Sequence, residues 1–308
     1  MTKTYYRISD LVIEANHQND LLFSRMHREL KPYCVVKARP PNALIEIVRE
    51  KKITAVPPKA VCAGYWPEPD EHRYLLDNVV YYRCAGKALF IKNYRKNRLS
   101  IRYISLNKRV LRHALAAIKW LIIKCAEDNG YAFVHGAAVH FLGKNIIFAG
   151  HSGSGKSSCL LRLNQAEAKI ISDDAVLIKG KSLASFFFDL NSKGDLAQRF
   201  RFDRIKRWPG ISRDTSSGEL FQGVDMIFFP HIWNHPVSRL TPVASKKAFK
   251  KLIEIYLKET SWNAYPAKQG VCEKRYKVGL TKTRCFDFFA GYREKDARKC
   301  LLDFIKHA

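Results

Sequence analysis

One stretch of this 308-residue chain has the residue types and spacing of a phosphate-binding loop. The pattern G-x-x-x-x-G-K-[ST] is met by Gly150, His151, Ser152, Gly153, Ser154, Gly155, Lys156 and Ser157, and Ser158 follows it. Gly150, Gly153 and Gly155 permit positive φ and let backbone N–H groups approach phosphate oxygens. Lys156 would reach the β- and γ-phosphates, and the Ser157 hydroxyl would contact Mg²⁺. We therefore expect the chain to bind a nucleoside triphosphate, ATP or GTP.

The sequence around the loop favours this interpretation over a plain glycine- and serine-rich turn beside a surface lysine. The apolar run 145–149 predicts a buried strand before the loop, and 158–163 predicts the first turns of a helix after it. The N-terminus of that helix adds unpaired N–H donors and the positive end of its dipole. Strand, loop and helix thus agree with one motif.

Two adjacent carboxylates, Asp173 and Asp174, end the next predicted strand, 168–172. Ligands of open α/β sheets bind at the carboxyl ends of strands, so we expect both residues to face the loop. Neighbouring side chains point in different directions. One carboxylate can therefore bind Mg²⁺ while the other accepts a proton from an incoming hydroxyl. The alternative is that the pair starts a turn before the predicted hairpin 175–190.

Histidines offer weaker signals. His135 lies in the predicted strand 133–141 and is followed by Gly136. A histidine in an apolar strand is, taken alone, more often structural than catalytic. The same structural interpretation applies to His140 and His151.

The other elements surround this centre. Short apolar runs separated by turn residues predict a β-rich accessory portion over 1–106. Asn107 can cap a helix that runs to about Asn129 and stops at Gly130, as a bridge to a nucleotide domain over 107–308. A strand over 224–229, closed by Pro230, and helices over 245–260 and 294–306 complete the expected α/β fold.

The composition restricts the classes of partner that we expect. Lys and Arg number 54 against 28 Asp and Glu, a net charge of +26 spread along the chain without a terminal basic arm. Such a surplus attracts polyanions, but no nucleic-acid-binding motif accompanies it. None of the eight cysteines forms C-x-x-C, which favours reduced thiols in the cytoplasm. No apolar run is long enough for a membrane span, so no membrane partner is expected.

The ordered set of Val134-His135-Gly136, the loop 150–157 and Ser172-Asp173-Asp174 resembles the catalytic core of HPr kinase/phosphorylase. It is particularly similar to HPr-kinase-related proteins of peptide-modifying pathways, such as lasso-peptide kinases. The resemblance covers roughly residues 130–180. It implies a P-loop kinase core like that of HPr kinase and the nucleotide domain of phosphoenolpyruvate carboxykinase, in a protein that is often oligomeric.

The resemblance also implies roles for these residues. Lys156 and the loop 150–158 would hold the triphosphate, with Ser157 and Asp173 on Mg²⁺. Asp174 would take the proton of a seryl hydroxyl, and His135 would lie in the catalytic centre. The family's later glycine-rich signature with its metal-binding glutamate is missing; Asp203 and Glu219 lie in that part of the chain without a matching motif.

The expected function is therefore ATP- and Mg²⁺-dependent phosphorylation of a serine-type hydroxyl on a protein or peptide. The basic segment 193–213 is a candidate for capture of an anionic substrate, since arginine pairs well with carboxylates and phosphates. Two alternatives stay open: a kinase of a small hydroxylated metabolite, and a non-catalytic module that binds polyanions, including nucleic acid, under the control of a nucleotide.

Overall fold

The computed structural model describes residues 1–18, 20–36, 40–53, 55–65, 71–84, 86–184, 186–187, 220–262 and 269–308. The chain is of mixed α/β type and divides into two compact units, Met1–Asn129 and the residues from Gly130 onward. This division differs from the expected one at 106/107, because the whole helix 108–128 belongs to the first unit. Among the described residues, no helix has the length and apolarity needed to cross a bilayer.

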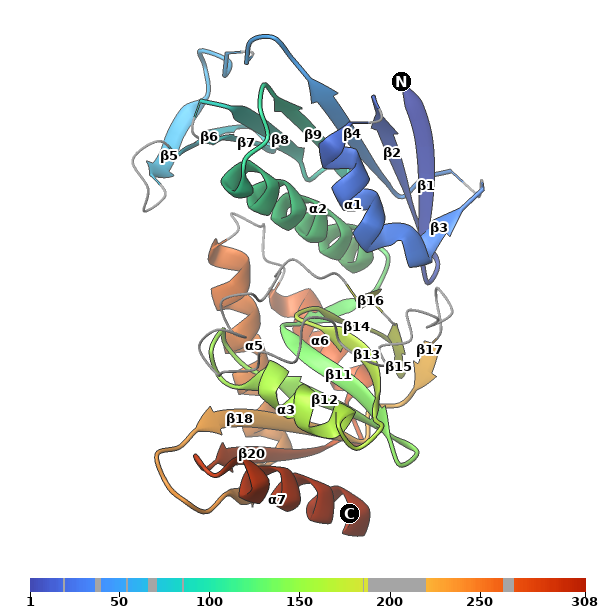
Figure 1. Ribbon diagram of the computed structural model, residues 1–308, viewed down its shortest axis with the longest axis vertical. Coiled ribbons are helices and arrows are strands. Elements are labelled where there is room, and N and C mark those ends of the chain that lie inside the picture. The colour runs from blue at the N-terminus through green and yellow to red at the C-terminus, as the bar shows by residue number, and fades with distance from the viewer. Residues whose placement is uncertain are drawn as a thin grey trace. The chain divides into compact units, whose positions relative to one another are not determined.

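The first unit is built on a nine-stranded sheet in the order β3-β1-β2-β4-β9-β8-β7-β6-β5. Helices α1 (Leu21–Leu30) and α2 (Lys108–Asp128) lie on one face of it (Figure 1), and the short helix η1 (Lys31–Tyr33) follows α1. The strands are β1 (Thr2–Ile8), β2 (Leu11–His17), β3 (Cys34–Val35), β4 (Ala43–Arg49), β5 (Val61–Tyr65), β6 (Glu71–Leu76), β7 (Val79–Cys84), β8 (Ala88–Asn93) and β9 (Arg98–Tyr103). The β-rich character of this portion is as expected.

The predicted helix after Asn107 is confirmed. Helix α2 begins at Lys108, and the Asn107 side chain accepts a hydrogen bond of 2.8 Å from the N–H of Val110. It ends at Asp128, just before Gly130, whose φ is +92°. The capping asparagine and the terminal glycine therefore act as the sequence indicated.

A buried ionic cluster, the Glu71 cluster, ties α2 to β6 and β7. Glu71 is fully buried and accepts hydrogen bonds from the Tyr82 hydroxyl and the Arg109 guanidinium, while His113 Nε2 lies 3.0 Å from its Oε1. Glu71, Cys84 and His113 also bring three potential metal-ligand atoms within 4.8 Å of one another. Because Arg109 already places a cation on the carboxylate, we interpret the cluster as a buried ion pair network.

The described part of the second unit contains two sheets. The larger has seven strands in the order β16-β13-β11-β12-β18-β20-β19, with β12, β18 and β20 parallel. Its strands are β11 (Gly136–Phe141), β12 (Lys144–Ala149), β13 (Lys169–Asp173), β16 (Phe186–Phe187), β18 (Met226–Ile232), β19 (Arg239–Pro242) and β20 (Arg284–Ala290). The smaller, antiparallel sheet has the order β10-β14-β15-β17 and comprises β10 (Ala132–Val134), β14 (Val176–Lys179), β15 (Ser182–Ala184) and β17 (Leu220–Gln222).

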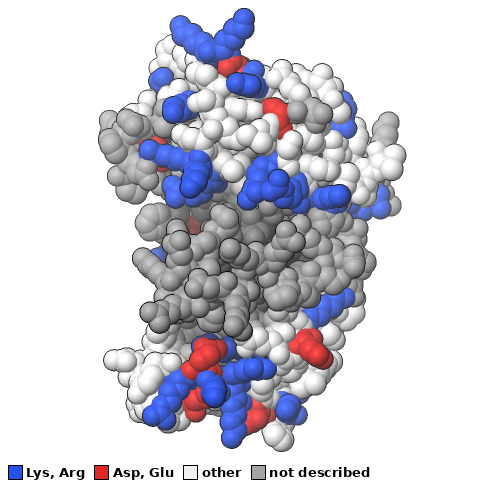
Figure 2. Space-filling view, viewed as in Figure 1, with Lys and Arg blue, Asp and Glu red and all other residues white. Residues whose placement is uncertain are grey.

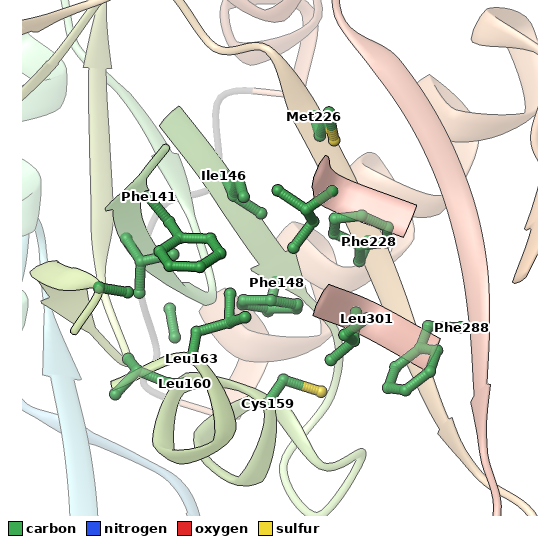
Figure 3. Packing of buried hydrophobic residues seen from close by; sticks show 14 of the residues in the cluster. Phe141, Ile146, Phe148, Cys159, Leu160, Leu163, Met226, Phe228, Phe288 and Leu301 are labelled. Carbon is green, nitrogen blue, oxygen red and sulfur yellow. The ribbon is translucent and has the colours of Figure 1, made fainter. Parts of the chain in front are cut away.

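The core of the second unit lies between the seven-stranded sheet and helices α3 (Lys156–Asn164) and α7 (Glu294–His307). Figure 3 shows Phe148 and Phe228 of the sheet beside Leu160 and Leu301 of these helices. Two further helices, α5 (Ser245–Trp262) and α6 (Gln269–Gly279), pack against each other, and α5 also contacts β20 and β10. The helices predicted over 245–260 and 294–306 are confirmed as α5 and α7.

Two predicted strands differ from those observed. The single strand expected over 133–141 is interrupted at His135, since β10 pairs with β14 whereas β11 pairs with β12 and β13. The strand expected to close at Pro230 continues to Ile232. Pairing of β18 with β12 ends at Phe228, whereas pairing of β18 with β20 continues through Pro230 to Ile232. The proline therefore lies where β18 no longer pairs with β12 and continues beside β20 alone.

Basic side chains are dispersed over the described surface. Figure 2 shows Lys and Arg at many separate places on the face in view, with fewer Asp and Glu among them. This agrees with a surplus of +26 that is spread along the sequence. The basic segment 193–213, together with Asp203 and Glu219, falls outside the described residues.

Candidate functional site

The site is built around the loop that connects β12 to α3. Gly153 and Gly155 adopt φ values of +82° and +100°, which side chains disfavour, so both glycines act as expected. Gly150 does not have positive φ; its role is close packing, because a Cβ there would lie 2.5 Å from Ser154 Oγ. The expectation of positive φ was therefore wrong for Gly150. At the other end of the loop, Gly155 caps α3 and leaves its first N–H groups at the loop.

Two half-buried loop side chains each have a polar atom that is shielded from solvent. His151 Nδ1 and Ser154 Oγ are each buried without a hydrogen-bond partner among the described residues. Burial, together with the nearby cations Lys258 and Lys156, lowers the pKa of His151, so its neutral form is favoured. Ser152 is exposed, whereas Ser157 and Ser158 begin α3 directly after Lys156.

Lys156 is buried and its ammonium group is held at the foot of the loop. Its Nζ donates a hydrogen bond of 2.8 Å to the carbonyl of His151 and lies 3.1 Å from His135 Nε2. Since an ammonium group can only donate, Nε2 of His135 acts as the acceptor in this pair. We therefore assign the neutral tautomer of His135 with its proton on Nδ1.

The two aspartates diverge, as the sequence predicted. Asp173 ends β13, and its Oδ1 accepts a hydrogen bond of 3.3 Å from the Ser157 hydroxyl. Asp174 adopts a φ of +74° and turns toward His135, whose Nδ1 lies 3.0 Å from its carbonyl and 3.3 Å from its carboxylate. One carboxylate therefore adjoins the start of α3 and the other adjoins the histidine.

The donors next to the loop suit Mg²⁺. A hydroxyl oxygen from Ser157 and a carboxylate oxygen from Asp173 are hard oxygen ligands, and they lie within 3.3 Å of each other. Such an ion usually keeps several waters and binds one or two carboxylates together with the phosphates of a substrate. Ser157 and Asp173 thus fit the expected cation.

Glu259 is a site residue that the sequence reasoning missed. It projects from α5, and its Oε1 lies 3.5 Å from His135 Nε2. Leu252 and Tyr256, on the buried face of α5, precede it by seven and three residues, so Glu259 belongs to the same stripe. A carboxylate in the apolar stripe of an amphipathic helix is the signal that could have revealed it.

The structure thus brings together the described residues that the sequence assigned to nucleotide binding and catalysis. The loop 150–158, His135, Asp173 and Asp174 meet near the carboxyl ends of β12 and β13, and α5 adds Glu259. The centre combines a buried ammonium group, a neutral imidazole, three carboxylates and the N-terminus of α3. Such a set can bind a polyphosphate, hold a divalent cation and accept a proton.

Comparison with known proteins adds no assignment: no protein-family model matches the chain, and no curated protein matches its sequence.

Proposed function

We propose that the chain is a P-loop kinase, related to HPr kinase, that transfers the γ-phosphoryl group of ATP to a serine-type hydroxyl of a protein or peptide. The observation that carries the proposal is the contact of Lys156 with His135, which in turn contacts Asp174. This chain of contacts joins a phosphate-binding residue to a potential base through one imidazole. A nucleotide-binding module without catalysis has no need for such a connection.

The reaction assigns a task to each side chain. The loop N–H groups and Lys156 bind the triphosphate, so Lys156 exchanges its bond to His135 for the β- and γ-phosphates. Ser157 and Asp173 would hold Mg²⁺, which would neutralise charge on the phosphates. The acceptor oxygen forms a bond to the γ-phosphorus as the bond from that phosphorus to the β–γ bridging oxygen breaks, and ADP leaves. Asp174 takes the proton of the acceptor hydroxyl.

His135 positions this base. Its Nδ1 proton points at the carbonyl and carboxylate of Asp174, which fixes the strained turn at that residue. When Lys156 moves to the phosphates, a proton taken up on Nε2 would let His135 donate to the Glu259 carboxylate, which lies 3.5 Å away. The histidine thus stays oriented in both the empty and the nucleotide-bound states.

The test is transfer of label from γ-labelled ATP with Mg²⁺ to a pool of cytosolic proteins and peptides, read by mass spectrometry. Wild-type and Asp174→Asn proteins are compared, since asparagine tolerates the positive φ of this position. We expect a labelled polypeptide with the wild type, and loss of the label with the variant despite retained ATP binding. Equal labelling by both proteins would refute Asp174 as the base.

Other outcomes of this experiment separate the alternatives. Label found in small molecules alone would identify a metabolite kinase. Tight ATP binding without any transfer, combined with salt-sensitive binding of mixed RNA or DNA, would identify a nucleotide-controlled polyanion-binding module.

A further inference from the structure

The carboxyl ends of β18 and β20 lie next to the phosphate-binding loop and carry exposed side chains that the phosphates do not require. Pro230 and Ile232 lie 3.9 and 4.0 Å from the position that a Cβ of Gly155 would take. Ile232 is 78% exposed, and Tyr292, which follows β20, is 64% exposed. His235, after β18, is also exposed. We call Ile232, His235 and Tyr292 the rim residues.

Hydrogen bonds and ring contacts connect the segments that carry the rim residues. Tyr292 N–H donates to the carbonyl of His235, which joins the segments that follow the two strands. The His235 ring stacks on Trp233 with 4.3 Å between centroids and 11° between planes. The guanidinium of Arg239 lies 4.7 Å from the Trp233 ring. Hydrogen bonding therefore fixes the backbone at Tyr292, and stacking holds the rings of Trp233 and His235.

The position of Lys156 in the loop indicates on which side of β12 each end of a bound triphosphate would lie. Lys156, which would bind the β- and γ-phosphates, lies beside His135, and Asp173 ends β13. In the seven-stranded sheet, β11 and β13 lie on one side of β12, whereas β18 and β20 lie on the other. The γ-phosphate therefore belongs on the side of β11 and β13, and the nucleoside end points toward the rim.

We propose that the rim binds the aromatic base of the nucleotide, with Ile232 and Tyr292 packing against the ring. This inference rests on the proposed function, since it assumes that the loop binds a nucleoside triphosphate. A base is the one apolar, planar part of that ligand, and stacking on aromatic or branched side chains removes its faces from water. The rim thereby distinguishes a nucleotide from a bare polyphosphate.

The experiment compares the affinities for MgATP and magnesium tripolyphosphate by calorimetry, because the second ligand lacks the base. The variants are Ile232→Ala and Tyr292→Ala, with Val278→Ala of α6 as the control, since Val278 is also exposed, at 58%. We expect MgATP binding to weaken about fivefold in Ile232→Ala and about tenfold in Tyr292→Ala. Tripolyphosphate binding should change by less than about twofold in each variant. The control should match the wild type for both ligands.

Selective loss of MgATP affinity in the two rim variants would support the base site. Unchanged MgATP affinity in both variants would overturn it while leaving the proposed kinase intact. Equal weakening for both ligands would also overturn it, because the substitutions would then act through the loop. A wild-type protein that binds neither ligand would instead refute the proposed function, and with it the base site.

Discussion

Substitution of Gly150 tests how tightly the phosphate-binding loop is packed. An added Cβ at this position would lie 2.5 Å from Ser154 Oγ and 3.2 Å from Ser154 Cβ. The first distance is well inside van der Waals contact, so the Ser154 side chain or the loop backbone must shift. Overpacking of this kind costs about 1–3 kcal/mol. We expect Gly150→Ala to lower the free energy of unfolding of the second unit by about 2 kcal/mol.

Ser154→Ala should relieve the conflict. The Ser154 hydroxyl is buried without a hydrogen-bond partner among the described residues, so its removal should be neutral or stabilising by up to about 1 kcal/mol. In the Ser154→Ala background the 2.5 Å contact is gone and only the 3.2 Å contact to Cβ remains. The cost of Gly150→Ala should therefore fall to below about 1 kcal/mol, a coupling of at least about 1 kcal/mol.

This double-mutant cycle compares four proteins by urea unfolding: the wild type, Gly150→Ala, Ser154→Ala and the double variant. Hydrogen exchange of amides in β12 and α3 follows the second unit separately, because two-unit chains need not unfold in one step. MgATP affinity is measured in parallel; Gly150→Ala should weaken it, and the double variant should recover part of it. A coupling below about 0.3 kcal/mol would show that Gly150 is not required by its contact with Ser154.

Three further predictions concern ionic contacts. Glu259→Gln should lower kcat/KM for phosphoryl transfer about tenfold, with MgATP affinity retained, because His135 loses an orienting carboxylate; an equal rate would exclude this role. Burial opposes ionisation of Glu71, but hydrogen bonds within the Glu71 cluster together hold its pKa below the ordinary value. Glu71→Gln should therefore cost about 2–3 kcal/mol in urea unfolding at pH 7, and the difference from wild type should shrink as pH falls through about 4. Arg162→Lys should lower unfolding stability by about 1 kcal/mol, since lysine cannot form the paired bonds of 2.9 and 2.7 Å to Glu294; unchanged stability would contradict this.

Sequence patterns predicted the elements that carry strong local signals. The apolar run before Gly150, the capping residue Asn107 and the stripe of α5 each specify their element through short-range physics. The expectation that Asp173 and Asp174 face the loop followed from their position at a strand end. These predictions needed no knowledge of distant contacts.

Other features depend on contacts that are far apart in sequence. The interruption at His135 was not predicted, because residues 132–141 are mostly apolar on both sides of His135 and only their pairing with two different sheets separates them. Gly136 is the one local residue that reflects this arrangement. A Cβ there would lie 2.7 Å from the Phe148 carbonyl of β12, so the close approach of the two strands requires glycine. The role of Glu259 likewise arises only when α5 packs beside the loop.

The interruption at His135 explains how a single residue can organise the site. His135 lies where the chain leaves one sheet and enters another. Its carbonyl accepts the Gly150 N–H at 3.3 Å, its Nε2 faces Lys156, and its Nδ1 faces Asp174. Backbone and side chain together therefore fix the first residue of the loop, the phosphate-binding lysine and the proposed base. The bond from the Gly150 N–H continues the β11–β12 register by one residue, so strand pairing itself anchors the first residue of the loop.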